Sequence, residues 1–342
     1  MSLEGISVCT PAKNEETTIA DLVDSIQKQN YNGPLEHLIC VNGSTDHTVE
    51  VVQELCRKYP NIHLMTSEPG KANAWKNLVD KSSYNALLFT DADVIIGQNS
   101  LKALQRTLRS KSHYAAAVGD RVKILVGLDF FSKLFHYPRE LKGVIARKNR
   151  KYVHVSGACY ILDKTKFLKR MHMKGYDHMP SGIISEDRWV SLVLKDMKYG
   201  AVVSDNIGYT PEAKFYFQAW AWDEHIAIER RIHKGYFQLD KQHPVLKNRD
   251  DNWQLMPPMR DLIQYASDVF WRWKESPLLE KILMPSIYPL AQATAFMWYN
   301  YAKLEAWLEC RNGKLSNLWA SSESSKKELL KQTVTDCYEN TV

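Results

Sequence analysis

The sequence predicts an α/β fold in which a mainly parallel sheet is flanked by helices and followed by a helical C-terminal extension. Short apolar runs alternate with amphipathic segments of about 10 to 15 residues over the first third of the chain, a pattern typical of parallel βαβ units. Polar loops follow several of these apolar runs. The chain has 342 residues, of which 44% are hydrophobic, so it can bury a large core and is neither disordered nor collagen-like.

The first elements follow one another regularly. Apolar runs predict strands over 6–10, 35–41, 62–66 and 86–90. Apolar residues at helical spacing predict helices over 17–29 and 72–81, and Val49, Val52 and Leu55 mark a helix between them. We expect the strands to be parallel neighbours because helices connect them.

Beyond residue 110 the alternation becomes less regular. A strand is expected over 153–161 and a helix over 186–195, and from Tyr209 onward we expect a mostly helical chain. The chain is therefore divided into an α/β domain over residues 1–235 and a helical extension over residues 236–342.

Charge and cysteine content limit the partners and the compartment. The 45 Lys and Arg exceed the 39 Asp and Glu by six, which suits an anionic small molecule or membrane face. This small excess of positive charge falls short of the dense basic stripe that nucleic-acid-binding proteins carry, so no nucleic acid partner is expected. The six cysteines form no CxxC pair, and the first residues carry no secretory signal pattern. We expect reduced thiols and a cytoplasmic protein.

Polar residues cluster where strands of the predicted sheet end, at 11–16, 42–46 and 91–93. In parallel α/β sheets the ligand lies at these carboxyl ends. Asp91 and Asp93 follow a buried strand, and two carboxylates at this spacing can share a hard divalent cation, which in turn binds a diphosphate. A solvated turn is the alternative for this pair.

Five motifs occur in an order that resembles glycosyltransferase family 2, whose catalytic domain has the GT-A fold. They are VCTPAKNEE at 8–16, VNGSTDHT at 41–48, GKANAWKN at 70–77, DAD at 91–93 and SEDR at 185–188. The resemblance covers roughly residues 5–235 and implies a glycosyltransferase that uses a nucleotide-diphospho-sugar. Residues 1–235 would then be the catalytic domain.

Carried over by position, the resemblance implies a donor site and a metal. The residues that it places against the donor are Pro11, Asn14, Glu15, Asn42, Lys71 and Asp91. Asn42 would face the base, where the family usually has aspartate, so a UDP-sugar is favoured but the preference is weakened. Asp93 would hold Mn²⁺ or Mg²⁺, with His225 and His233 as candidates for a further ligand.

A general base is expected in the first turn of the helix at 186–195. The resemblance implies Asp187, with Glu186 as the alternative. In an inverting transfer this carboxylate removes the acceptor's hydroxyl proton while the sugar carbon is attacked from the face opposite the leaving group. Ser185 is expected to cap the helix, and the helix dipole to keep both carboxylates ionised.

Acceptor contacts are implied further along the chain. Gly157 is expected on a strand that forms the floor of the acceptor pocket, and Gln218 and Trp222 match part of a QxxRW motif. Ala221 stands where this motif has arginine, and Arg230 and Arg231 are the candidates to substitute for it. If neither does, the loss of the arginine favours transfer of a single sugar to a glycan or lipid-linked acceptor. A core-packed amphipathic helix is the alternative for these tryptophans.

Two segments could contact a membrane surface. The uncharged run at 282–302 is long enough to span a bilayer but contains two prolines and several polar residues, which favours a buried or surface-lying segment. Aromatic residues at 129–137 precede a basic stretch at 139–151, a combination that anionic bilayers attract. We expect at most peripheral contact, at the inner face of the membrane.

Two alternatives from other classes remain at this point. A nucleotidyltransferase also uses a Rossmann-like sheet with metal-binding carboxylates, but it needs a glycine- and arginine-rich loop after the first strand, where this chain has PAKN. A decayed, non-catalytic relative would bind a nucleotide weakly or not at all. The retained Asp91, Asp93 and Asp187 favour an active enzyme.

Overall fold

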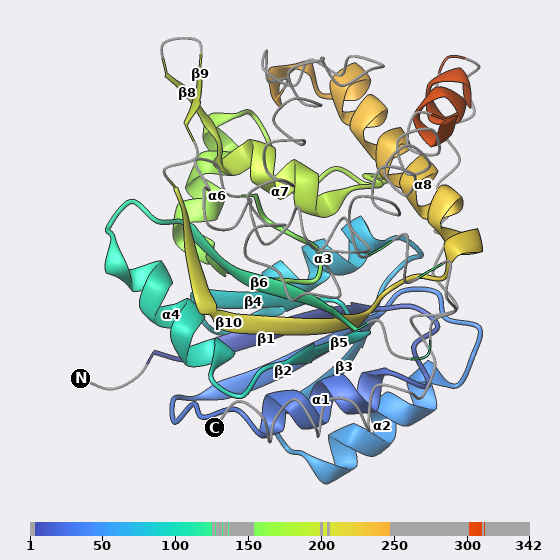
Figure 1. The fold of residues 1–342 in the computed structure, drawn as a ribbon. Helices are drawn as coiled ribbons and strands as arrows, with labels where there is room; N and C mark the ends of the chain where they lie inside the picture. The colour runs from blue at the N-terminus through green and yellow to red at the C-terminus, as the bar shows by residue number, and fades with distance from the viewer. Residues whose placement is uncertain are drawn as a thin grey trace, which may run out of the picture.

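A computed structural model of the protein describes residues 4–124, 127, 132, 136, 154–198, 201–203, 206–246, 301–309 and 311 (Figure 1). The first half contains β1 (Ile6–Ala12), α1 (Ile19–Gln27), β2 (Leu35–Val41), α2 (Thr48–Lys58), β3 (Ile62–Thr66), α3 (Lys71–Lys81), β4 (Ala86–Thr90), β5 (Val94–Ile96), α4 (Ser100–Ser110) and β6 (Ala116–Ile124). The second half contains β7 (Cys159–Asp163), α6 (Lys164–Met173), α7 (Glu186–Leu194), β8 (Asp196–Lys198), β9 (Ala201–Val203), β10 (Ile207–Gln218), α8 (Trp222–Gln242) and a short 3₁₀ turn at Pro244–Leu246.

Eight of these strands form one sheet in the order β3-β2-β1-β4-β7-β6-β10-β5. The pairs among β3, β2, β1 and β4 are parallel, as the helical connections predict. The strand β7 runs antiparallel to both of its neighbours, and β5 runs antiparallel to β10. The mixed, mainly parallel α/β class is therefore confirmed.

Both faces of the sheet are covered, and the strands alternate between two cores. Along β4, Ala86 and Leu88 pack toward α1, α2 and α4, whereas Leu87 and Phe89 pack toward α3, α6 and α7. Figure 1 shows α1 and α2 on one side of the sheet and α6 and α7 on the other. This alternation with a period of two explains why the central strands are apolar on both faces.

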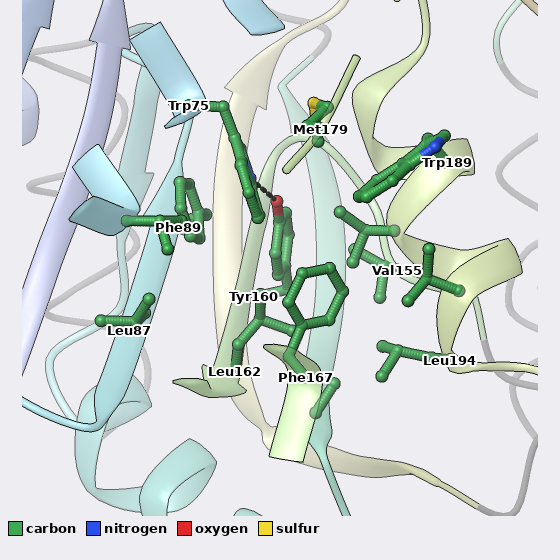
Figure 2. Packing of buried hydrophobic residues seen from close by; sticks show 14 of the residues in the cluster. Trp75, Leu87, Phe89, Val155, Tyr160, Leu162, Phe167, Met179, Trp189 and Leu194 are labelled. Atoms are coloured by element: carbon green, nitrogen blue, oxygen red, sulfur yellow. Dashed lines mark hydrogen bonds between the residues drawn. The ribbon is translucent and has the colours of Figure 1, made fainter. Parts of the chain in front are cut away.

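An aromatic cluster joins the two helices that carry predicted site residues (Figure 2). Trp75 of α3 stacks on Phe89 of β4 at 5.0 Å between ring centroids and meets Trp189 of α7 edge-on at 6.4 Å. The Trp75 indole donates a hydrogen bond of 3.0 Å to the Tyr160 hydroxyl on β7. Because buried aromatic pairs contribute packing and specific geometry, this cluster holds α3 and α7 in a defined relation to β4.

The prediction of a mostly helical chain from Tyr209 onward is wrong in part. Residues up to Gln218 belong to β10, which pairs with β6 on one side and β5 on the other. Pro211 lies where the register shifts between Tyr209 and Lys214, a position at which a strand tolerates proline. The strand was missed because its partners are distant in sequence.

The chain becomes helical from Trp222, and residues 301–309 form a further helix. The helix α8 runs without interruption from Trp222 to Gln242, across the predicted division between residues 235 and 236. The rest of the predicted extension, apart from residue 311, lies outside the described residues. The described helices include no segment that is both long and apolar enough to cross a bilayer. The segments at 282–302 and 129–151 lie almost entirely outside the described residues.

A buried histidine makes stability depend on pH. His37 of β2 is fully buried, and burial lowers its pKa to about 3. Its Nε2 lies 2.9 Å from the Thr10 hydroxyl, and its Nδ1 has no hydrogen-bond partner among the described residues. In the unfolded chain the imidazole takes up a proton near pH 6.5, so this contribution to stability is lost as the pH falls from about 6.5 toward 3.

We expect His37→Gln to reduce the acid sensitivity of the fold. Between pH 7 and pH 5 the free energy of unfolding should fall by about 2 kcal/mol less in the variant than in the wild type, since one pKa unit corresponds to about 1.4 kcal/mol. Urea unfolding at both pH values measures this difference. The matched control is His63→Gln, an exposed histidine on β3. Equal pH dependence in wild type and His37→Gln would contradict a neutral buried His37.

Candidate active site

A cavity of about 720 Å³ lies at the carboxyl ends of the central strands. Its lining comes from the loop after β1, the start of α3, the turn after β4, the turn before β7, the first turn of α7, and α8. Several residues predicted from different motifs therefore meet at one place. They are Pro11, Glu15, Lys71, Asp91, Asp93, Gly157, Glu186 and Asp187.

The turn Asp91-Ala92-Asp93 connects β4 to β5. Ala92 is buried, whereas both aspartates are partly exposed and line the cavity. The Asp91 amide donates to the carbonyl of Ala158 at 3.2 Å, which ties this turn to the one before β7. The paired carboxylates thus face the cavity from the end of a buried strand.

The charges around this turn suit a divalent cation. Burial raises the pKa of Asp91 and, although Lys71 opposes the effect, the negative charges of Asp93 and Asp187 add to it. Within the described part of the chain, no group of three or more His, Cys, Asp or Glu side chains is arranged to hold a metal. Mg²⁺ and Mn²⁺ sites commonly use one or two carboxylates and complete their shell with phosphate oxygens and water. Asp91 and Asp93 fit such a site.

Lys71 lies at the start of α3 and is largely buried, with 12% of its side chain exposed. Its ammonium contacts Asp91 Oδ1 at 2.6 Å and also forms an ion pair with Glu186 Oε1. Burial by itself would lower the pKa of Lys71, but the two carboxylates raise it above its ordinary range. Lys71 is therefore a charged bridge between two site residues from different motifs.

The first turn of α7 carries Glu186 and Asp187 into the cavity. Asp187 accepts a hydrogen bond from the Gly157 amide at 3.1 Å and one from the Arg188 amide at 2.7 Å. Glu186 is 5% exposed, and burial raises its pKa despite the opposing effect of Lys71. Burial thus opposes the ionisation of Glu186 that the helix dipole was expected to favour. Ser185 occupies the N-cap position, but its side chain makes no capping hydrogen bond.

The two loops predicted to hold the nucleotide are joined by hydrogen bonds. Asn14 has a φ of +55°, and its side-chain oxygen accepts from the Thr45 amide at 2.8 Å. The backbone N–H of Asn14 donates to the Ser44 hydroxyl at 2.9 Å, and the backbone N–H of Glu15 donates to the Thr48 hydroxyl at 2.8 Å. Asn14 thus connects the loops but is not part of the cavity lining.

Asn42 ends β2 and is fully buried next to these loops. Neither its side-chain oxygen nor its nitrogen has a hydrogen-bond partner among the described residues. A buried amide without partners costs free energy, and a polar ligand that reached Asn42 would offset this cost. Asn42 itself does not line the cavity.

The predicted acceptor residues are placed differently from one another. Gly157 lies in the turn before β7, not within a strand, because β7 begins only at Cys159. Gln218 ends β10 and is buried away from the cavity lining. Trp222 begins α8, and its side chain lies outside what the structure describes. Trp220 lines the cavity instead.

Sequence reasoning missed further cavity residues, including Lys13, Arg121, Phe217 and Trp220. A signal existed for both aromatic residues, since Trp220 lies within the motif that contains Gln218 and Trp222, and Phe217 directly precedes it. No signal marked Arg121, which comes to the cavity only because β6 pairs with β10.

The arginines and histidines of α8 that were considered as site residues differ in whether they line the cavity. Arg231 lines the cavity, whereas Arg230 binds Glu305 at 3.0 Å and Glu309 at 3.6 Å on the helix at 301–309. His233 is buried outside the cavity lining, and burial lowers its pKa to about 4. The side chain of His225 lies outside the described set.

The first half of the chain is similar to known proteins. Residues 7–169 match the family model described as Glycosyl transferase family 2. The poly-beta-1,6-N-acetyl-D-glucosamine synthase of Staphylococcus epidermidis is 32% identical over 101 residues, which are 29% of this chain and 24% of the relative. The synthase of the same name from Staphylococcus aureus strain COL is 31% identical over 99 residues. The chain thus spans about a quarter of the length of these curated relatives.

A solved structure supports the fold over most of the chain. The mannosyltransferase from Pyrobaculum calidifontis, in complex with GDP-Man and Mn²⁺, is similar with a TM-score of 0.60 over 90% of this chain and 87% of that one. Its sequence identity to this chain is 17%, so the likeness concerns the fold and not the substrate.

Proposed function

We propose that the protein transfers a sugar from a nucleotide-diphospho-sugar to a glycan or lipid-linked acceptor, because residues 7–169 match the family model described as Glycosyl transferase family 2. The proposal rests on one observation above all. A single cavity gathers Asp91 and Asp93 from one motif and Asp187 from another, with Lys71 between the end of β4 and the start of α7. This arrangement provides for donor binding on one side and proton removal on the other.

The donor side is formed by the loop after β1 and the turn after β4. Pro11 and Glu15 would lie against the nucleotide, and Asp91 would contact the ribose or the sugar. The family resemblance places Asn42 against the base, and its amide can both accept and donate, but a base could reach this buried side chain only if the loops beside it move. A UDP-sugar is favoured, with a hexosyl or N-acetylhexosaminyl group, and the names of the staphylococcal relatives favour N-acetylglucosamine among these.

Asp93 would hold a divalent cation, with Asp91 beside it. Such a cation offsets the negative charge that develops on the leaving nucleoside diphosphate. Asp91 and Asp93 also orient the donor by their position on a short turn between two buried strands.

Asp187 would act as the general base. Its two carboxylate oxygens are held by the amides of Gly157 and Arg188, so the side chain is oriented before any acceptor binds. Glu186 is less suited, because its carboxylate is buried and already binds the Lys71 ammonium. Removal of the acceptor's proton by Asp187 during attack on the anomeric carbon would invert the configuration in one displacement.

The acceptor would enter between the turn at Gly157 and the wall formed by Phe217, Trp220 and α8. Arg231 lines the cavity and would substitute for the missing arginine of the QxxRW motif. Arg230 is less suited, because it is bound to Glu305 and Glu309. We favour transfer of a single sugar because Ala221 takes the arginine's place in the motif.

Calorimetric titration with UDP, GDP, CDP and dTDP, each with and without Mn²⁺, tests the donor class. We expect UDP to bind at least about tenfold more tightly with Mn²⁺ than without it, and more tightly than the other three. Transfer assays would then use sugars carried by the nucleotide that binds. If none of the four nucleotides binds, a decayed site becomes the better description and the proposed function is wrong.

A further inference from the structure

The Lys71 ammonium lies between the proposed donor side of the cavity and the helix turn that carries the proposed general base. It contacts Asp91 Oδ1 at 2.6 Å on the strand end and Glu186 Oε1 on the first turn of α7. The side chains of Lys71 and Glu186 are 12% and 7% exposed. These three groups, which we term the Lys71 bridge, come from three motifs that are separated in sequence.

We propose that Lys71 is a positioning residue. Its ammonium binds Glu186 and Asp91 and thereby holds the first turn of α7, which carries Asp187, next to the end of β4. It does so instead of binding a phosphate of the donor. The inference deepens the proposed function and rests on it.

The surroundings of the bridge connect it to Asp187. A Cβ atom added to Gly157 would lie 3.4 Å from Asp91 Oδ2 and 3.6 Å from both Glu186 Oε1 and Lys71 Nζ, so the Gly157 backbone closes one side of the bridge. The amide of the same Gly157 donates to Asp187 Oδ2 at 3.1 Å. A shift of Glu186 or of the Gly157 turn would therefore move the carboxylate of Asp187.

The packing beneath the bridge is consistent with this role. Trp75 lies one turn after Lys71 on α3, and Trp189 lies next to the first turn of α7. Their rings meet edge-on at 6.4 Å, so α3 and α7 are in direct contact. The aromatic contact sets the distance between the two helices, and the ion pair above it sets the position of their N-terminal turns.

Electrostatics explains why a cation is needed at this point. Asp91, Glu186, Asp187 and Asp93 bring four carboxylates to one cavity wall. Without Lys71, the buried carboxylate of Glu186 and the partly exposed carboxylate of Asp91 would lose their compensating cation, which is unfavourable for the buried group above all. The ammonium is thus committed to two carboxylates, whereas a donor phosphate would have to compete with both of them for it.

The test uses Lys71→Met, which removes the charge and keeps most of the side-chain length. Turnover in a sugar-transfer assay should fall by about 100-fold, since a displacement of about 1 Å at a reacting group costs this much. The affinity for UDP with Mn²⁺ should stay within about threefold of the wild type, because the phosphates do not rely on Lys71. Thermal unfolding of each variant shows that the assay temperature lies below its melting transition.

A second substitution separates positioning from phosphate binding. In Lys71→Met combined with Glu186→Gln, the uncompensated charge on α7 is gone, so turnover should recover by about tenfold over Lys71→Met. A phosphate ligand would not be replaced by a change at Glu186. The matched control is Lys76→Met, an exposed lysine on the same helix, which should leave turnover and affinity unchanged.

The outcomes are distinct. If Lys71→Met loses UDP affinity by about tenfold or more and Glu186→Gln restores nothing, Lys71 is a phosphate ligand and the inference is overturned. Near-normal turnover of Lys71→Met would also overturn it, since the bridge would then serve stability alone. If the wild type binds no nucleotide, the proposed function has failed, and this is seen before any variant is measured.

Discussion

Asp187→Asn is expected to abolish sugar transfer while leaving donor binding intact. The amide is not a base, and general base catalysis typically contributes about 10² to 10⁴ in rate, so we expect turnover to fall by about 1000-fold. The affinity for the nucleotide with Mn²⁺ should be unchanged within about twofold, because Asp187 lies on the acceptor side in the proposed mechanism. Turnover by product formation and affinity by calorimetry are the two measurements.

The fold of this variant should survive. Asparagine can still accept a hydrogen bond from one of the two amides that Asp187 now binds, at Gly157 or Arg188. Loss of the other should cost about 1 kcal/mol of stability. Asp177→Asn, at an exposed position between α6 and α7, is the matched control and should transfer sugar normally. A fully active Asp187→Asn would assign the base to another group, with Glu186 the first to examine.

The stereochemistry of the product provides an independent check of the same mechanism. A single displacement assisted by Asp187 gives a product whose anomeric configuration is opposite to that of the donor. Proton NMR of the product reports this configuration. A retained configuration would exclude the one-step reaction even if Asp187→Asn is inactive.

Asp93→Ala is expected to remove the dependence of nucleotide binding on a divalent cation. With Mn²⁺ present, UDP affinity should fall by about tenfold or more, to the level that the wild type shows with a chelator. The reason is that the metal would lose its protein ligand on the turn after β4, where only Asp91 would remain. Titration of both proteins with UDP, with Mn²⁺ and with EDTA, measures the effect.

The substitution should leave the core undisturbed, because Asp93 is partly exposed and Ala92, its neighbour, carries the buried contact of this turn. Asp80→Ala removes an exposed carboxylate near the end of α3 and serves as the control. Unchanged UDP affinity with Mn²⁺ in Asp93→Ala would show that the metal is held elsewhere. Equal affinity of the wild type with and without Mn²⁺ would show that no metal takes part in binding.

Local sequence pattern was sufficient for the first half of the fold. The strands predicted at 35–41, 62–66 and 86–90 agree with β2, β3 and β4 residue for residue. They could be found because each is a short apolar run bounded by polar loops, and β4 and most of β2 are buried on both faces. The first strand continues two residues further than predicted, to Ala12, and α3 begins one residue earlier, at Lys71.

The strands in the second half of the chain could not all be predicted from local sequence pattern. The strand β10 contains the exposed residues Pro211 and Glu212 in its middle, so its pattern is not that of a central strand. It is a strand because β6 and β5, about 90 to 120 residues earlier, supply the partners for its backbone hydrogen bonds. Pairing at such distances depends on the complete sheet.

The motifs named most of the residues at the cavity but not their relations. Asp91, Asp93, Glu186 and Asp187 were expected there, and all four line it. Lys71 was expected against the donor, and the structure adds that its ammonium binds Asp91 and Glu186. The partner of a long, flexible cation is decided by which carboxylates share its buried surroundings, and this does not follow from residue order.

By itself, the sequence determined the βαβ elements of the first half, the family resemblance and the residue types available for catalysis, because these depend on short-range periodicity and on motifs of a few residues. Only the tertiary structure decided the position of β10, the presence of Trp220 and Arg231 at the cavity, and the Lys71 bridge. These features depend on contacts between segments far apart in the chain, whose energy is gained only when the sheet and the helices on its two faces are packed together.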